Sequence, residues 1–588
     1  MHVVATAGHV DHGKSTLVRA LTGTDPDRLA EERRRGLTIE LGYCWTSLPG
    51  ATDGPCVDLA VDLAFVDVPG HERFVTTMLA GVGPVPAALL VVAADDPWMP
   101  QTSEHLAALD ALGVSHGVVA VTRSDLADPG PATVRVRAEI AGTSLAGARV
   151  VPVSGRTGAG LDDLRAALVT MVEGLPTPNP AADVRLWVDR RFSVRGVGTV
   201  VTGTLPAGTV RVGDVLATDD GLVRVRGLQA LERDESAVRG VARVALNLTG
   251  DVDAITRGSA LTTPQAWHHT SAVDVRVTGA GDPPLNPRLH IGAADLTVRH
   301  RPLGPGLARL SLERPLPLRI GDRCLLRDPG RRVVWRVDVL DPDPPRLRRR
   351  GAAARRANAL AEADGGARLA DELTRRGIAH RDRMRQLGVP LTDGDHLVAG
   401  PWLIGPTAAE ALARRVPSLV ESHACQHPLD PAVPVSVLAA RLGLPSPDLV
   451  AHLVRPPLRV ADGRVRAPEA DSLPPAVAAA VESVRRELIS APFRAPTADR
   501  LRDLGLDERA LAAAERAGLL WRAAPGIVLL PDAPDVAVAR MRGLEQPFST
   551  SAARQVLNST RRVVLPLLER LDRLGRTSRL PDDRRHVR

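Results

Sequence analysis

A glycine-rich loop near the N-terminus contains the first residues whose types and spacing could do chemistry. Gly8, Gly13, Lys14 and Ser15 fit the pattern Gly-x-x-x-x-Gly-Lys-Ser within the stretch "TAGHVDHGKSTL". In this pattern, backbone N–H groups surround a β-phosphate at the positive end of the next helix, and the serine hydroxyl binds Mg²⁺. The sequence therefore predicts a nucleotide-phosphate site. The other contacts expected from this loop are Asp11 and Thr16.

Lys14 is the only lysine in a chain with 75 Lys and Arg residues. An ammonium group is compact and can bridge β- and γ-phosphate oxygens inside a tight loop, where a broad planar guanidinium does not fit. The presence of lysine at this one position supports the phosphate-binding interpretation and gives Lys14 an expected catalytic role.

Two further segments supply groups for the γ-phosphate. Thr38, in "RRRGLTIELGY", offers a hydroxyl and a backbone N–H that can close over Mg²⁺ and the γ-phosphate. The stretch "LAFVDVPGHERF" indicates a buried strand whose end carries Asp67, Gly70 and His71. We expect Asp67 to contact Mg²⁺ and Gly70 to donate its N–H to the γ-phosphate. His71 is expected to orient the attacking water.

Two later loops are expected to bind the base. Asp125 ends the stretch Thr-Arg-Ser-Asp, where the guanine-specific pattern is Asn-Lys-x-Asp, and its carboxylate can accept two hydrogen bonds that adenine cannot supply. Arg123 can stack its guanidinium on the base, while Thr122 loses one amide hydrogen bond. In "VVPVSGRTGAGLDDL", the backbone N–H groups of Ser154 and Gly155 would meet guanine O6. The residues expected to bind the base are Thr122, Arg123, Asp125, Ser154, Gly155 and Arg156. Together and in this order, the five motifs predict a GTPase.

The elements that must position these residues are strands followed by loops. "HVVATAG" is a short β-branched run that indicates a buried strand, and "KSTLVRALTG" has the spacing of a helix that ends at Gly23. The later motifs also follow apolar, strand-like runs. Residues 1–178 are therefore expected to form an α/β domain of the P-loop GTPase class.

Length and composition bound the rest of the chain. At 588 residues, the chain should divide into several domains of roughly 100–200 residues each. A net charge of +7 is modest for this size. The four cysteines are scattered without zinc-ligand spacing, which predicts a reduced cytoplasmic protein without a structural metal. No window approaches the ~18 apolar residues of a membrane span, so no membrane association is expected.

Four motifs resemble those of the translational GTPases of the elongation factor Tu type: "GHVDHGKST", "RGLTIELGY", "DVPGHERF" and "VDRRFSVRGVGTVVTGTL". The resemblance implies two β-barrels at residues 179–266 and 267–345, and both segments show short alternating strands with Gly and Pro turns. "RGLTIELGY", "GDRCLLRDPGRR" and the long C-terminal extension are most similar to the selenocysteine-specific elongation factors. This resemblance implies the cofactors GTP and Mg²⁺ and a cytoplasmic monomer. It also implies three partners: selenocysteinyl-tRNA, the ribosome and a messenger RNA hairpin that marks a UGA codon.

The resemblance further implies that the barrel of residues 179–266 holds the aminoacyl end of the tRNA. Asp189 and Arg190 of "VDRRFSV", with Arg243 of "GVARVALNL", match the motif positions. Selenols are more acidic than thiols, so converging arginines would favour the selenocysteine anion over serine. Arg191 follows Arg190, and neighbouring strand residues face opposite sides, so either arginine could point inward.

The stretch "DPDPPRLRRRG" ends the second barrel, because its prolines prevent continued strand pairing. Residues 346–351 are expected to form a linker. Beyond it, helix pairs with short hairpins recur, which is typical of winged-helix modules. The four expected modules span residues 352–420, 421–469, 470–538 and 539–588. A plain helical scaffold is the alternative for the first two or three modules.

The last module is rich in arginine, because residues 551–588 contain ten arginines and four acids. This charge coincides with the expected start of a recognition helix and with a wing, which predicts nucleic-acid contact through Arg561, Arg562, Arg576 and Arg579. Only 2% of the chain is aromatic, so shape and phosphate readout of a structured hairpin is favoured over single-strand binding. The family resemblance implies the same RNA hairpin.

Two alternatives stay open. A general elongation or initiation factor would share the features up to about residue 345 but would leave the C-terminal extension unexplained. An RNA-binding regulator that uses GTP only as a structural ligand predicts negligible ribosome-stimulated hydrolysis and no preference among aminoacyl-tRNAs.

Overall fold

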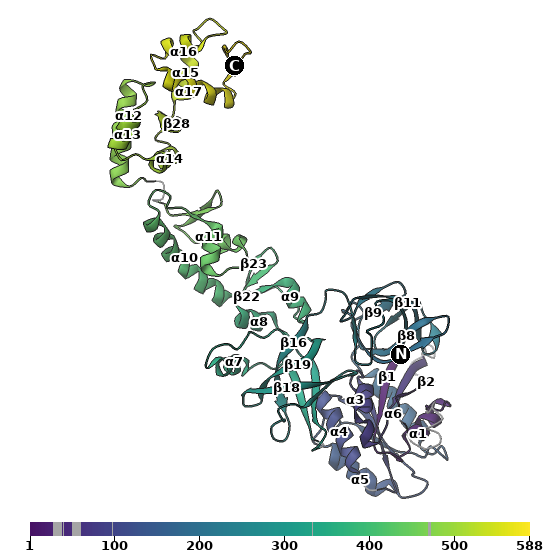
Figure 1. Ribbon diagram of the computed structural model, residues 1–588. Coiled ribbons are helices and arrows are strands. Elements are labelled where there is room, and N and C mark those ends of the chain that lie inside the picture. The colour runs from purple at the N-terminus through teal and green to yellow at the C-terminus, as the bar shows by residue number, and fades with distance from the viewer. Residues whose placement is uncertain (27–37, 39, 50–59, 97, 332, 469–471) are drawn as a thin grey trace, which may run out of the picture. The chain divides into compact units, whose positions relative to one another are not determined.

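The computed structural model describes residues 1–26, 38, 40–49, 60–96, 98–331, 333–468 and 472–588 (Figure 1). Contacts within the chain define two compact units. The first contains residues 1–375 and 379–394, and the second contains residues 376–378 and 395–588.

A six-stranded sheet forms the centre of the N-terminal domain. Its strands are β1 (His2–Ala7), β2 (Gly42–Pro49), β3 (Ala60–Asp67), β4 (Ala87–Ala93), β5 (His116–Thr122) and β6 (Arg149–Pro152). The order is β2-β3-β1-β4-β5-β6, with β2 antiparallel to β3 and the other pairs parallel. In β1, Val3 packs into the core on one face and Val4 into the core on the other. Continuous apolar strands are expected for a sheet covered on both faces.

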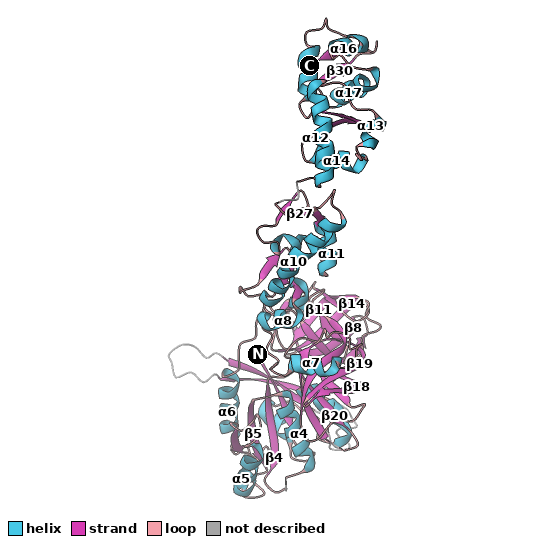
Figure 2. Cartoon of the chain, turned by 90° about the vertical axis from the view of Figure 1, so that its left-hand side faces the viewer, coloured by secondary structure: helices cyan, strands magenta, loops and turns pink. Residues whose placement is uncertain are grey.

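Helices cover both faces of this sheet. They are α1 (Lys14–Thr22), α3 (Val75–Val82), α4 (Pro100–Leu112), α5 (Pro129–Ile140) and α6 (Leu161–Glu173), with a 3-10 turn η1 (Glu72–Phe74). Helices α4 and α6 contribute to different cores and lie on opposite sides of β4 and β5 (Figure 2). Helix α1 starts after Gly13 and stops at Gly23, which have φ of 81° and 74°. Glycine adopts this left-handed conformation without steric cost, so the helix starts and ends as the sequence predicts.

The first barrel is a closed ring of six strands. These are β7 (Arg185–Val194), β8 (Gly198–Leu205), β10 (Val215–Ala217), β11 (Leu222–Ala230), β14 (Ala242–Gly250) and β15 (Ala260–Thr262). Strand β12 (Arg233–Asp234) pairs with β11, and β9 (Thr209–Arg211) pairs with β13 (Ala237–Arg239). The inner side chains form one apolar core that includes Leu186, Val201 and Leu246.

The second barrel is also closed, in the order β16-β19-β18-β17-β20-β21. Its strands are β16 (His269–Thr278), β17 (Arg288–Ile291), β18 (Ala294–Gly304), β19 (Leu307–Pro317), β20 (Arg323–Asp328) and β21 (Val333–Asp341). Trp335, which is 2% exposed, is its largest core side chain. The α/β domain and both barrels are thus confirmed.

Helix α7 (Ala352–Leu360) follows the second barrel and packs beside β18 (Figure 1). Leu347 and Leu360 share a small apolar core with Leu303 and Leu307 of the barrel. Residues 346–351 are therefore not a free spacer, because their one apolar side chain is packed. The expected boundary at residues 351/352 separates segments that the structure holds together.

The rest of the chain alternates helices with short hairpins. In chain order the elements are α8 (Leu369–Arg376), β22 (Ile378–His380), α9 (Arg381–Gln386), β23 (Leu397–Ala399), β24 (Trp402–Ile404), α10 (Pro406–Gln426), β25 (Val433–Pro434), α11 (Val435–Leu442), η2 (Pro447–His452), β26 (Arg459–Ala461), β27 (Arg464–Arg466), α12 (Pro475–Ser490), α13 (Ala498–Asp503), α14 (Glu508–Arg516), β28 (Trp521–Ala524), β29 (Ile527–Leu529), α15 (Ala533–Met541), α16 (Thr550–Val556), α17 (Arg561–Arg573), β30 (Thr577–Arg579) and β31 (Arg585–Val587). The helices followed by a two-stranded wing in the second, third and fourth repeats match the winged-helix order.

Several expected module boundaries differ from these elements. The boundary at 420/421 falls inside α10, and the boundary at 538/539 falls inside α15. Both helices are continuous amphipathic segments that contribute Val416, Val420, Val538 and Met541 to apolar cores. The boundary at 469/470 lies outside the described residues.

The last two repeats share a single core. Val484 and Phe493 belong to the same buried cluster as Leu557, Val564 and Leu568. Ser559 donates to the carbonyl of Phe493 across the two repeats. The third and fourth repeats therefore pack as one body.

None of the described residues forms a helix long and apolar enough to span a membrane. Cys44 and Cys324 are buried and Cys425 is exposed, while Cys56 lies outside the described residues.

Candidate functional site: a nucleotide cavity and an arginine pocket

Lys14 lies buried inside the glycine-rich loop. Its ammonium donates to the carbonyl oxygens of Gly8 over 3.1 Å and of His9 over 2.6 Å. A Cβ atom on Gly70 would lie 2.5 Å from Lys14 Nζ and 2.6 Å from the backbone nitrogen of Val10. Such contacts are too short for any side chain, so glycine is required at position 70. Gly70, which is expected to contact the γ-phosphate, therefore packs directly against the glycine-rich loop.

The three residues expected to bind Mg²⁺ lie together. Ser15 Oγ donates to Asp67 Oδ2 over 2.7 Å and lies 3.0 Å from Thr38 Oγ1. Asp67 is fully buried, and Thr6 Oγ1 donates to its Oδ1 over 2.7 Å. Hydroxyl and carboxylate oxygens are the hard ligands that Mg²⁺ prefers, so this set fits the ion.

A cavity of about 680 Å³ joins the phosphate loop to both base loops. The expected residues that line it are Asp11, Gly13, Lys14, Ser15, Thr16, Thr38, Gly70, Thr122, Arg123, Asp125, Ser154, Gly155 and Arg156. Gly8, Asp67 and His71 do not line it. Arg19 and Leu126 line the cavity and were not predicted. Leu126 is 62% exposed and directly follows the expected base acceptor Asp125, and this adjacency was the available sequence signal.

Two residues of the first base loop use their side chains on the phosphate loop. Thr122 Oγ1 donates to the carbonyl of His12 over 2.7 Å. Arg123 pairs with Asp95 at 3.1 Å and donates to the carbonyl of Asp11. Stacking of Arg123 on a base would therefore require these contacts to break. Asp125 is exposed, and no ion pair engages it within the described part of the chain.

The second base loop differs from expectation at Ser154. Its backbone N–H donates to the carbonyl of Ala159 over 2.9 Å. Its hydroxyl accepts from the N–H of Thr157 over 3.1 Å. The N–H of Ser154 is thus committed to folding the loop and is not available to guanine O6. This correction leaves Gly155 as the expected N–H donor.

His71 does not reach the cavity. Its Nδ1 accepts from the N–H of Arg73 over 3.2 Å and caps the 3-10 turn η1. Its ring centroid lies 6.0 Å from that of Phe74. The predicted water-orienting role therefore needs a rotation of this side chain toward Gly70.

Two buried histidines at the phosphate loop, His12 and His105, were not predicted from the sequence. His105 Nδ1 accepts from the N–H of Gly8 over 2.9 Å, and burial lowers its pKa to about 3. Burial also lowers the pKa of His12 to about 4, although Asp96 lies 3.4 Å away. Both rings are therefore neutral and act as uncharged supports of the loop. His105 lies on α4, far along the chain, so no local motif marks it.

A β-bulge shapes the predicted aminoacyl pocket. The pairing of β7 with β8 skips one residue between Val188 and Arg190, so Asp189 is the extra residue. A bulge lets neighbouring residues share a face, which ordinary strand alternation forbids. Asp189 consequently faces Arg243, while Arg190 donates to the carbonyl of Leu41 over 2.9 Å. The structure thus selects Arg190 over the exposed Arg191.

Asp189 and Arg243 form a buried bidentate pair. Arg243 Nη2 donates to Asp189 Oδ1 over 2.7 Å, and Nη1 donates to Oδ2. Burial alone lowers the pKa of Arg243, but the adjacent Asp189 carboxylate outweighs it and raises this pKa. Thr202 Oγ1 donates to Asp189 Oδ1 over 2.8 Å. The guanidinium is therefore charged and fixed in orientation.

Tyr43 completes this pocket and was not predicted. Its ring centroid lies 3.9 Å from the guanidinium carbon of Arg243 and 5.5 Å from that of Arg190. Burial raises the pKa of its hydroxyl. Tyr43 belongs to β2, only five residues after Thr38, and it is the only tyrosine in the chain. A cavity of about 220 Å³ lies beside these three side chains.

The four arginines expected to bind RNA have different surroundings. Arg562 donates to the carbonyls of Ala495 and Pro496 over 2.8 and 2.9 Å. Arg576 pairs with Asp535 at 3.2 Å, and Arg579 pairs with Asp583. Arg561 is exposed and has no ion-pair partner among the described residues. Within this set, Arg561 alone presents its charge without a partner in the described structure.

The sheet, the phosphate loop and the two barrels together define a class of protein. The family model for the elongation factor Tu GTP binding domain matches residues 1–174. The family model for the elongation factor SelB winged helix matches residues 540–586. The chain is accordingly a GTPase of the elongation factor Tu type with a C-terminal winged-helix domain.

Similarity to known proteins identifies one family within this class. The selenocysteine-specific elongation factor of Escherichia coli K12 is 34% identical over 472 residues, which cover 76% of this chain and 74% of that protein. The factor of the same name from Desulfomicrobium baculatum is 38% identical over 346 residues, and the match spans about half of that relative, 53% of its length. The crystal structure of a bacterial selenocysteine-specific elongation factor, EF-Sec, has the same fold, with a TM-score of 0.77, 23% identity and full coverage of both chains. This chain belongs to the family of selenocysteine-specific elongation factors.

Proposed function

We propose that this protein delivers selenocysteinyl-tRNA to the ribosome in a GTP-dependent manner, at UGA codons marked by a messenger RNA hairpin. The observation that carries the proposal is the pocket in which Arg190 and Arg243 converge beside Asp189, in a chain of this family. The protein would act as a cytoplasmic monomer.

The nucleotide cavity supports the switching part of the proposal. Lys14 would leave the carbonyls of Gly8 and His9 and bind the β- and γ-phosphates. Thr38 and Gly70 would donate backbone N–H groups to the γ-phosphate, so their segments would be ordered by GTP and relax after hydrolysis. His71 would rotate toward the γ-phosphate and orient the attacking water.

Mg²⁺ would be held by Ser15, Thr38 and Asp67. When bound there, the ion would neutralise negative charge on the β- and γ-phosphate oxygens. Thr6 contributes by holding Asp67 in place through its 2.7 Å hydrogen bond.

The arginine pocket supports the choice of amino acid. Selenocysteine carries a selenolate at neutral pH because selenols are more acidic than thiols, whereas the serine side chain is neutral. Arg190 and Arg243 line this cavity together with Glu232. Arg243 is paired with Asp189, and Arg190 lies 3.2 Å from Glu40. A selenolate could replace the exposed Glu40 as the partner of Arg190, whereas the neutral serine side chain could not.

The C-terminal domain would bind the RNA hairpin. Arg561 stands at the first position of α17, the expected recognition helix, and its side chain is exposed. Arg576 and Arg579 would have to exchange Asp535 and Asp583 for phosphate groups. Anchoring near the codon would raise the effective concentration of the tRNA there.

The test is protection of the aminoacyl ester bond. Selenocysteinyl-tRNA and seryl-tRNA with the same tRNA body are incubated with the protein and either GTP or GDP, and ester hydrolysis is followed. Strong GTP-dependent protection of the selenocysteinyl ester alone is expected. Equal protection of both esters would favour the alternative of a general elongation factor. No protection with either nucleotide would favour the alternative of an RNA-binding regulator.

A further inference from the structure

An exposed arginine segment follows the second barrel. It runs from Pro345 to Arg356, and no Asp or Glu occurs between residues 344 and 361. Its exposed arginines are Arg346, Arg348, Arg349, Arg350 and Arg355. None of the five has a hydrogen-bond or ion-pair partner for its side chain among the described residues.

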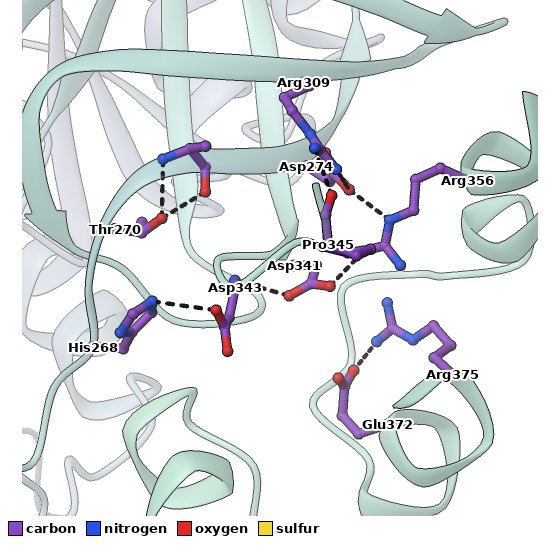
Figure 3. Close-up of polar contacts among 11 residues, drawn as sticks. His268, Thr270, Asp274, Arg309, Asp341, Asp343, Pro345, Arg356, Glu372 and Arg375 are labelled. Atoms are coloured by element: carbon purple, nitrogen blue, oxygen red, sulfur yellow. Dashed lines mark hydrogen bonds and ion pairs between the residues drawn. The ribbon is translucent and has the colours of Figure 1, made fainter. Parts of the chain in front are cut away.

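The segment is anchored by a buried ion cluster (Figure 3). Asp274 of β16 is fully buried and accepts from Arg309 over 2.6 and 2.9 Å. The same carboxylate accepts from Arg356 of α7 over 2.6 Å. Arg356 also donates to Asp341 at the end of β21. The carboxylates of Asp274 and Asp341 thus neutralise the guanidinium groups of Arg309 and Arg356. The cluster ties α7 to β16 and β21.

Further contacts hold the start of the segment and the end of α7. Arg309 donates from its remaining nitrogen to the carbonyl of Pro345 over 2.8 Å. Arg276 of β16 donates to the carbonyls of Ala361 and Ala363 over 3.0 and 2.9 Å. Leu347 packs into the apolar core under α7. The five exposed arginines therefore lie on a preformed surface.

On this surface the five positive side chains are held close together, and no carboxylate of the described residues is paired with them to offset their repulsion. A flexible linker could spread its charges, but anchors at Pro345 and Arg356 prevent this. Thirteen residues past Arg355, Arg368 shows the ordinary arrangement, with ion pairs to Asp364 and Asp371. An unpaired cluster on a fixed backbone is the electrostatic pattern of a polyanion site.

The neighbouring strand adds to the same charge. Helix α7 packs beside β18, where Arg299 and Arg301 are both exposed. No side-chain partner engages either residue in the described part of the chain. Residues 336–401 contain no Phe, Trp or Tyr, so base stacking is not available here.

We propose that the arginine segment, with Arg299 and Arg301, binds the phosphate backbone of a double-stranded stem of the tRNA body. Guanidinium groups without stacking partners suit duplex RNA, which is recognised by shape and phosphate contacts. The segment belongs to the same compact unit as the arginine pocket. The choice of tRNA as the duplex rests on the proposed function, whereas the recognition of duplex RNA does not.

The test uses the full-length protein with GTP and measures the affinity for a fluorescent tRNA transcript against salt concentration. The quadruple variant R346Q/R348Q/R349Q/R350Q should bind roughly 10- to 100-fold more weakly near 0.1 M salt, and the salt slope should fall by about 3. The variant with lysine at the same four positions should keep the wild-type slope. These side chains are exposed, so circular dichroism should match that of the wild type.

A matched control removes the same charge elsewhere. The variant R135Q/R165Q/R485Q/R502Q loses four arginines that are already paired with carboxylates. It should bind the tRNA within about twofold of the wild type, since exposed pairs contribute little. An equal loss of tRNA affinity in both quadruple variants would mean that only the net charge of the protein matters, and this result would overturn the proposal. Unchanged binding in the segment variant would also overturn it.

Two further probes separate this proposal from the proposed function. A 20-base-pair RNA duplex should show the same loss in the segment variant as the tRNA does, while a loss confined to a single-stranded 20-mer would overturn the proposal. The preference for selenocysteinyl over seryl esters should be unchanged in the segment variant. If the wild type lacks that preference, the proposed function fails, and the duplex measurement still decides whether this surface binds RNA.

Discussion

The ring of Tyr43 stacks on the guanidinium of Arg243, with 3.9 Å between the ring centroid and the guanidinium carbon. Tyr43 belongs to the GTPase domain, and Arg243 belongs to the first barrel. The strand that carries Tyr43 begins four residues after Thr38, which lies beside Ser15. The contact therefore joins the nucleotide cavity to the arginine pocket through a few residues of backbone.

Replacement of Tyr43 by Leu should weaken this link. Cation–π contacts of this kind contribute about 0.5–2 kcal/mol, so the ratio of affinities for selenocysteinyl-tRNA with GTP and with GDP should fall roughly 2- to 30-fold. Tyr43→Phe keeps the ring and should stay within about twofold of the wild type. Equal ratios in the leucine variant and the wild type would show that Tyr43 only fills space.

Lys14→Arg should abolish GTP binding, even though every other residue among the 75 Lys and Arg is arginine. Lys14 is 6% exposed, and its ammonium donates to two backbone carbonyls, where a planar guanidinium has no room. Affinity for a fluorescent GTP analogue should fall more than about 100-fold, as in Lys14→Ala. The reverse exchange at an exposed site, Arg135→Lys, should leave affinity unchanged. Near-normal binding by Lys14→Arg would contradict the steric argument.

Gly70→Ala should weaken nucleotide binding by steric conflict. The new Cβ would lie 2.5 Å from Lys14 Nζ and 2.6 Å from the nitrogen of Val10, so the loop would have to move. We expect at least a roughly tenfold loss of GTP affinity by equilibrium titration. Gly142→Ala is the matched control, because nothing lies within 4 Å of its Cβ position. Similar affinities for the two variants would mean that the loop yields at little cost.

His71 is expected to act on water, yet it also caps a helical turn, and two variants separate these roles. His71→Asn keeps a side-chain acceptor for the N–H of Arg73, whereas His71→Ala does not. Both variants should lose ribosome-stimulated GTP hydrolysis by roughly 10²- to 10⁴-fold and keep GTP affinity. Full activity in the asparagine variant would leave His71 with the capping role alone.

The neutral state of His105 makes the stability of the GTPase domain depend on pH. Its pKa is lowered from the unfolded value of 6.5 to about 3 in the fold, so between these values the unfolded chain binds one more proton. The contribution of neutral His105 to the free energy of unfolding is fully present above pH 6.5 and falls by about 1.4 kcal/mol for each pH unit below it. In His105→Gln, hydrogen exchange of β1 should lose this part of its pH dependence between pH 6.5 and 5. Parallel pH profiles for the two proteins would show that His105 does not titrate in this way.

Local motifs account for most of what could be predicted. Gly13 and Gly23 mark the ends of α1. Ser15 and Asp67 converge because the parallel strands β1 and β3 end at one edge of the sheet, and Thr38 joins them because the antiparallel strand β2 begins there. The two barrels follow from alternating strands and turns. Each of these signals lies within a short stretch of sequence.

Long-range pairings account for the rest. The bulge at Asp189 depends on the pairing of β7 with β8, so the sequence alone left Arg190 and Arg191 equivalent. Thr122 bonds His12 across 110 residues, and Arg576 pairs with Asp535. A pattern of residue types cannot identify partners at such distances.

The shared core of the last two repeats limits how the C-terminal winged-helix domain can be isolated. The family match begins at residue 540, inside α15. A fragment cut there would lose Phe493 and Val484 from the core around Leu557 and Val564, and it would leave Arg562 without its backbone acceptors. A fragment that starts before Pro475 keeps α12 and the whole core. The smallest part of this end of the chain that keeps its core intact is therefore the pair of winged helices formed by the third and fourth repeats.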